Sequence, residues 1–160
     1  MLETLLAVRG PDEEGDGARV LFLEEHLGRM ARSGRLLGLT EHLRTDPLAE
    51  AVLRATRQGF MDDTEATHLR VRVTLTGGDL NMLEVARGGA AGGAAGGGPA
   101  REQTPTLLIV AQRATQYPEE MFARGVRVSI ADMKANPLDP FAGHKTLNYW
   151  GRLRELQVAV

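Results

Sequence analysis

Hydrophobic and polar positions change their spacing along the first part of the chain. Residues 2–8 form a compact apolar run that is broken only by Glu3 and Thr4. Turn-forming residues fill 10–17 and residues 19–23 are apolar again, which predicts a hairpin of two strands. From Leu23 onward the apolar residues recur every three or four positions, so we expect an amphipathic helix that ends near Gly38.

The same criteria predict two further helices. The second begins at Asp46-Pro47, where aspartate can cap free N–H groups and proline suits the first turn, and Gly59 closes it. The third runs from about Lys145 to Val158, and its inner side carries Leu147, Trp150, Leu153 and Leu156 or Gln157.

Three later segments are predicted to be strands. Residues 68–76 alternate between apolar and polar side chains, whereas residues 106–111 and 126–130 are continuous apolar runs of strand length. The stretch 88–98 contains only glycine and alanine and is expected to be a mobile loop, and the polar stretch 112–125 is expected to be a connection. Strands before and after two inserted helices indicate an α+β domain with a largely antiparallel sheet.

Composition and charge exclude several classes of protein. The formal net charge of -2 over 160 residues argues against nucleic-acid binding, which needs a basic excess. The chain has no cysteine, which excludes disulfides and cysteine zinc sites, and its histidines lack the spacing of metal ligands. No apolar stretch is long enough for a membrane span and the first residues lack a leader pattern, so we expect a cytoplasmic protein.

A candidate reactive amine follows the proline-stiffened segment 136–143. Lys145 would stand at the start of the last helix, where the helix dipole and burial near Phe141 and Trp150 both disfavour a protonated amine. A neutral lysine can attack a carbonyl group to form an imine, and Tyr149 would share its helix face. The alternative, which the residues alone favour, is a surface lysine beside a structural proline loop.

Arginines on the first helix and on the alternating strand are candidate anion ligands. Arg29 lies one position from the apolar stripe and presents a planar fork suited to a phosphate, or it pairs with Glu25 at the surface. Arg70 and Arg72 share one strand face, where they can bind a carboxylate or form a solvated surface. Spacing favours the surface alternative for both sites, and His26 is expected to be a hydrogen-bonded packing residue.

Four motifs together resemble one enzyme family. Glu3-Thr4, the helix segment 23–33, the strand segment 69–78 and the segment Gly143 to Tyr149 occur in the order seen in class IV aminotransferases. That family includes branched-chain and D-amino-acid aminotransferases and aminodeoxychorismate lyase, all dependent on pyridoxal 5'-phosphate. The resemblance rests chiefly on the first helix and on the lysine segment.

The resemblance implies roles for the cofactor-binding residues. Lys145 would form the Schiff base and carry a proton between cofactor and substrate. Arg29 would bind the cofactor phosphate, and Tyr149 or Asn148 would lie near the cofactor ring.

The resemblance also implies a substrate pocket and a division into domains. Arg72 would help to shape the pocket for the substrate carboxylate, and Leu2 replaces an aromatic residue that commonly lines it. The family fold would give an N-terminal α+β domain at 1–112, an interdomain connection at 113–121 and the beginning of the cofactor domain at 122–160.

The expected reaction is amino transfer between an amino acid and a 2-oxo acid. Pyruvate elimination from aminodeoxychorismate and a non-catalytic fragment are the alternatives. Compared with the family, the chain resembles a form truncated at both ends, and the glutamate that binds the pyridine nitrogen would follow Val160. By the same resemblance we expect a homodimer.

Overall fold

A four-stranded antiparallel sheet forms the centre of the protein. The computed structural model describes residues 1–10, 17–78, 105–134, 136 and 138–159. The sheet has the order β2-β1-β3-β4, with β1 at Leu2–Arg9, β2 at Ala18–Val20, β3 at His68–Leu75 and β4 at Leu107–Arg113. The predicted hairpin, the alternating strand and the α+β class are confirmed.

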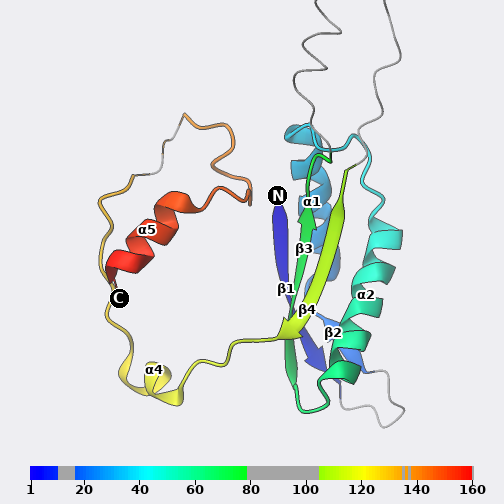
Figure 1. Cartoon of the computed structure of the whole chain (residues 1–160), viewed down its shortest axis with the longest axis horizontal. Helices are drawn as coiled ribbons and strands as arrows, with labels where there is room; N and C mark the ends of the chain where they lie inside the picture. Colours follow the sequence, from blue (N-terminus) through cyan, green and yellow to red (C-terminus); the bar gives the residue numbers. More distant parts are fainter. Residues whose placement is uncertain (11–16, 79–104, 135, 137, 160) are drawn as a thin grey trace, which may run out of the picture.

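Two helices cover one face of this sheet. They are α1 (Leu23–Leu36) and α2 (Thr45–Asp62), which lie on the same side of the strands in Figure 1. Their buried side chains pack against the inward-facing residues of β1 and β3, and burial of this apolar surface is the main stabilising contribution. The buried residues that form the centre of this layer include Leu5, Ala7, Leu27, Met30, Val52, Phe60, Val71 and Val73.

Gly59 does not close α2, as the sequence predicted, because the helix continues to Asp62. A Cβ atom at this position would lie 2.9 Å from Cδ1 of Leu69 and 3.0 Å from Cβ of Ala111. The glycine therefore lets the helix backbone approach β3 and β4, and the geometry that stops the helix comes three residues later.

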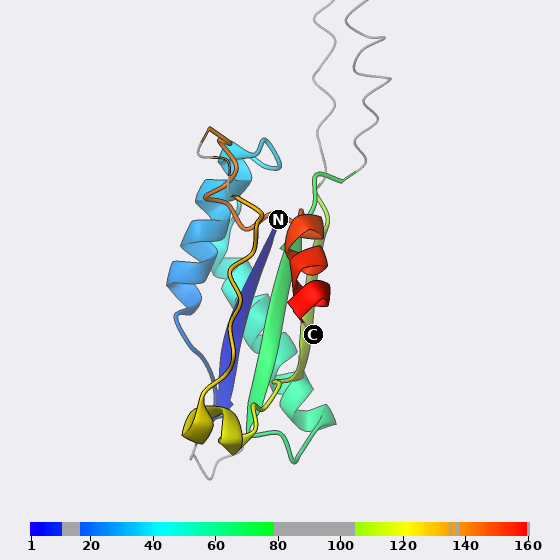
Figure 2. The same ribbon diagram turned by 90° about the vertical axis from the view of Figure 1, so that its left-hand side faces the viewer.

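The chain leaves the sheet after β4 and continues past its other face. Helix α4 (Glu119–Arg124) lies in the stretch expected to be a connection, and α5 (Trp150–Ala159) lies across from the face opposite α1 and α2 (Figure 2). Within the described residues these segments are mostly exposed. They return to the sheet near the start of β1, where Leu2 donates a backbone hydrogen bond to Lys145.

Two predictions for the last third of the chain are wrong. Residues 126–130 form no strand, and Ile130 is 98% exposed, because no neighbouring strand in the described part of the chain supplies the hydrogen bonds and packing that a strand needs. The last helix begins at Trp150 rather than at Lys145, and its expected inner residues are exposed. The expected loop at 88–98 and most of the expected turn at 10–17 lie outside the described residues.

None of the helices in the described part of the chain has the length and apolar character that a bilayer span requires.

We predict opposite effects on stability for two helical glycines. Gly59→Ala should lower the free energy of unfolding by about 1–2 kcal/mol, because overpacking against Ala111 outweighs the gain in helix propensity. Gly28→Ala is the matched control in α1, where a Cβ would meet only the flexible end of Arg32, and it should raise stability by about 0.5–1 kcal/mol. Urea unfolding measures both, and stabilisation by Gly59→Ala would contradict the close approach.

Candidate functional site

A buried carboxylate joins β1 to α1. Glu3 lies between inward-facing Met1 and Leu5 in the strand and has a side chain that is 0% exposed. Its carboxylate accepts hydrogen bonds from Nε and Nη2 of Arg29 at 2.7 and 2.5 Å, and Nδ1 of His26 lies 2.9 Å from it. A buried charge needs such partners, because its transfer out of water is otherwise costly.

The contacts of His26 indicate which ring nitrogen carries a proton. Its Nδ1 atom lies 2.9 Å from Glu3 and 3.0 Å from Nη2 of Arg29. An ionised carboxylate only accepts hydrogen bonds and a guanidinium only donates them, so Nδ1 cannot serve both. The buried charge of Glu3 lies close to Nδ1 and favours a proton on that atom, which His26 donates to Glu3. Nη2 of Arg29 then lies close to Nδ1 without a hydrogen bond between the two atoms.

Burial and hydrogen bonding have opposite effects on Glu3. Burial alone would raise its pKa, but hydrogen bonds and positive charge from Arg29 and His26 outweigh burial and hold the pKa below the ordinary 4.5. The hydrogen bond to Glu3 correspondingly raises the pKa of Arg29. The pair is therefore ionised at neutral pH.

The lysine segment meets the same end of β1. The N–H of Leu2 donates to the carbonyl of Lys145 at 2.9 Å, and Nδ1 of His144 lies 2.9 Å from Oγ of Ser33. Ser33 is buried and stands one helical turn after Arg29 on α1. Two contacts thus hold the half-buried Lys145 beside the strand and the helix that carry Glu3 and Arg29.

The structure corrects the reasons given for a reactive Lys145. The residue precedes α5 by five positions and lies outside any helix, so neither the helix dipole nor a helix face shared with Tyr149 acts on it. Phe141 is 48% exposed and Trp150 is 80% exposed, so they do not enclose the amine as expected. Proximity to β1 and α1 is the feature that singles this lysine out.

Three further residues predicted for the site are Tyr149, Asn148 and Leu2. Tyr149 is half-buried and its ring stacks under the guanidinium of Arg152, with 5.7 Å between the charge centre and the ring centroid. Asn148 is exposed. Leu2 is buried and contacts Lys145 directly through the backbone.

Arg72 is exposed on the sheet face opposite the helices. In the register of the sheet it stands between Thr4 of β1 and Val110 of β4. The adjacent Arg70 can donate to the amide oxygen of Gln112 when that amide is turned to present it. The sheet therefore places Arg72 on the face toward α5, two residues along β3 from Thr74, which pairs with Leu2.

Sequence reasoning missed the partner of Arg29. The expected surface partner was Glu25, whereas the structure pairs Arg29 with Glu3 of the sheet. A signal was present, because Glu3 occupies an inward position of a strand whose other inward residues are apolar. The contact between Ser33 and His144 spans 111 positions and carries no local signal.

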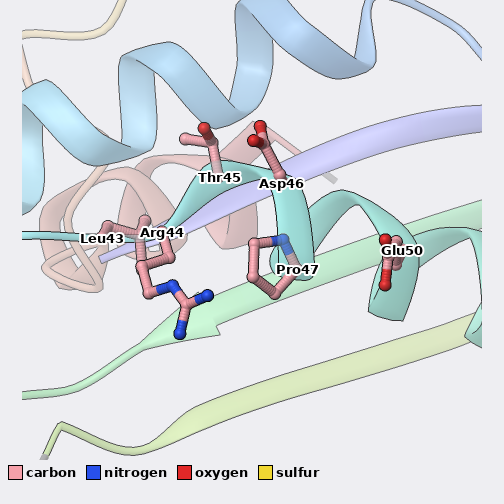
Figure 3. Close-up of a pocket in the computed structure, with 6 residues that line it drawn as sticks. All are labelled: Leu43, Arg44, Thr45, Asp46, Pro47 and Glu50. Atoms are coloured by element: carbon pink, nitrogen blue, oxygen red, sulfur yellow. The ribbon is translucent and has the colours of Figure 1, made fainter.

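A pocket lies elsewhere, at the start of α2 (Figure 3). It is lined by Leu43, Arg44, Thr45, Asp46, Pro47 and Glu50, and none of the predicted site residues contributes to it. Within the described ranges no group of acidic and histidine side chains is arranged to hold a metal ion.

Comparison with protein-family models identifies a family that the chain matches. The family model for amino-transferase class IV matches residues 2–160. A search of curated proteins finds no match to the chain.

We predict that Glu3 accounts for part of the loss of folding stability at acid pH. Because its pKa is lower in the folded protein than its ordinary 4.5, the stability it contributes is present above about pH 4.5 and is lost as pH falls through the folded value. In urea unfolding, Glu3→Gln should therefore lose less stability than the unaltered protein between about pH 7 and pH 3.

Asp63 is the control for this experiment. Its pKa is lowered by Arg113, so it contributes with the same sign, but both side chains of this pair reach solvent and salt screens it. In about 1 M salt the effect of Asp63→Asn on the pH dependence should shrink while that of Glu3→Gln persists. An unchanged pH dependence in Glu3→Gln would contradict the ionised, buried pair.

Proposed function

The chain belongs to the class IV aminotransferase family, and we propose that it binds pyridoxal 5'-phosphate through Lys145 and Arg29 and transfers an amino group from an amino acid to a 2-oxo acid. The family is dependent on this cofactor. The observation that carries the proposal is the position of the lysine segment beside β1 and α1. The backbone hydrogen bond from Leu2 to Lys145 and the side-chain contact between Ser33 and His144 hold it there.

The chemistry of the two side chains fits the cofactor. Arg29 is 50% exposed although two of its nitrogens bind Glu3, and its Nη1 has no hydrogen-bond partner among the described residues. A guanidinium edge that faces solvent is a ligand for a phosphate. The amine of Lys145 likewise makes no hydrogen bond within the described part of the chain, so it is available to an aldehyde.

Several residues of the chain have separate roles in the proposed reaction. The bound cofactor supplies an electron sink that makes the substrate α-hydrogen acidic. Lys145 is proposed to bind the aldehyde carbon and later to hold and return the proton at Nζ, and Arg29 anchors the phosphate. Arg72 binds the substrate carboxylate, Leu2 forms a pocket wall, and Tyr149 or Asn148 limits the space near the ring.

We further propose the larger organisation that the sequence suggested. Residues 1–112 would form the small domain, 113–121 the connection and 122–160 the beginning of the cofactor domain. Exposed apolar side chains in the last segment, among them Val128 and Leu153, support further contacts there, and a homodimer acting in the cytoplasm is the expected state.

The two lysines of the chain give a matched test of imine formation. Protein mixed with pyridoxal 5'-phosphate should gain an imine absorption band that borohydride bleaches, and peptide mass spectrometry should find the reduced adduct on Lys145. Lys145→Ala should lose the band, while Lys134→Ala should keep it because Lys134 is exposed and lies in a separate segment.

Adducts in equal amounts on both lysines would contradict a defined site. For transamination, amino acid added to the loaded protein should convert the band to that of the amine form of the cofactor. Release of pyruvate from aminodeoxychorismate without an amino acceptor would instead identify the lyase.

We predict that Arg29 selects for the phosphate group. Arg29→Gln keeps a donor for Glu3 but loses the charge, so the affinity for pyridoxal 5'-phosphate should fall by roughly tenfold or more while the affinity for pyridoxal stays within about twofold. Absorbance titrations with both aldehydes measure this, and circular dichroism checks that the variant is folded. An equal fall for the two aldehydes would argue against a phosphate contact.

A further inference from the structure

We propose that Glu3 is a positioning residue that holds the guanidinium of Arg29 in the orientation in which it receives the cofactor phosphate. This inference rests on the proposed function and goes beyond it, because it assigns a role in anion binding to a carboxylate. Its basis is the geometry of one buried group that has two neighbouring donors.

Glu3 contacts one edge of the guanidinium and leaves another edge open. Its two oxygens accept from Nε and Nη2 of Arg29 in a bidentate pair, which fixes the plane of the group as well as its place. Nη1 takes no part in this pair, and the side chain is half exposed. The free edge is therefore presented to solvent in a defined direction.

Burial and hydrogen bonds restrict the carboxylate itself. Glu3 stands opposite Val73 in the ladder between β1 and β3, one pair in from the end at Leu2 and Thr74, and its side chain is enclosed between sheet and helix. His26 binds the same carboxylate from the preceding turn of α1. Arg29 thus has little rotational freedom left to lose when an anion binds, which favours binding.

The negative charge of Glu3 also has an effect on phosphate binding that opposes positioning. A carboxylate next to a guanidinium neutralises its charge and on that ground should weaken phosphate binding. In this protein the carboxylate accepts hydrogen bonds from both Arg29 and the N–H of His26, so its charge does not act on the arginine alone. Positioning and neutralisation predict changes of opposite sign when Glu3 loses its charge, so an experiment can separate them.

The test compares Glu3→Gln with Glu25→Gln in the full chain. Both variants lose one negative charge near Arg29, but Glu25 is exposed on α1 and Arg29 pairs with Glu3 instead. The measured quantity is the ratio of the dissociation constants for pyridoxal and pyridoxal 5'-phosphate, from the absorbance of the imine. This ratio reports the phosphate contact alone, because both aldehydes use the same lysine.

Glu3→Gln should reduce this ratio by about five- to tenfold, with the affinity for pyridoxal within about twofold of the unaltered protein. Glu25→Gln should leave the ratio unchanged or raise it slightly. If Glu3→Gln does not fold, as circular dichroism would show, Glu3→Asp keeps the charge but withdraws it by one methylene, and the same reduction is expected. A merely structural role would weaken binding of both aldehydes equally.

Three results would overturn the inference. A larger ratio in Glu3→Gln would show that neutralisation dominates, and an unchanged ratio in both Glu3 variants would show that Arg29 needs no positioning; the proposed function stands in either case. Absence of any imine with the unaltered protein would overturn the proposed function and this inference together.

Discussion

A charge that is removed from water constrains the rest of this structure. Glu3 interrupts the apolar inner face of β1, and the ion pair with Arg29, together with the hydrogen bond from His26, stabilises it there. Loss of one partner of a buried pair commonly costs about 3–5 kcal/mol, and the half-exposed Arg29 places this pair toward the lower end. The register of α1 on the sheet is therefore set by a polar contact as well as by apolar packing.

This constraint connects segments that are far apart in the sequence. Arg29 and Ser33 lie on one side of α1, so the helix that binds Glu3 also contacts His144. Leu2, the neighbour of Glu3, contacts Lys145. A guanidinium and an amine are thereby attached to a common strand and helix, and this shared attachment supports the proposal that both bind one cofactor.

The spacing of apolar residues predicted the elements that are stabilised by one dominant apolar face. The hairpin, α1 and β3 have such faces, and the structure confirms them. Residues 126–130 have the composition of a strand, but a strand also needs a neighbour, and composition does not provide one. Gly59 resembled a helix terminator, whereas its function is close approach to β3 and β4.

Sequence alone suggested candidate site residues but not the contacts between them. Resemblance pointed to Lys145 and Arg29, and the match of the family model to residues 2–160 supports the family. The physical reasons offered for Lys145 were wrong, because the helix on which they depended begins five residues later. Glu3 was noted as part of a motif, but its partners were not predicted, because a strand pattern shows which positions are inward and not which distant side chain meets them.

A crystal structure of the protein with pyridoxal 5'-phosphate tests the central claim most directly. We predict continuous density between Nζ of Lys145 and the aldehyde carbon, with the phosphate on Nη1 of Arg29 while Nε and Nη2 stay bound to Glu3. Density for the cofactor elsewhere on the chain, or a phosphate bound by an Arg29 that has left Glu3, would contradict it.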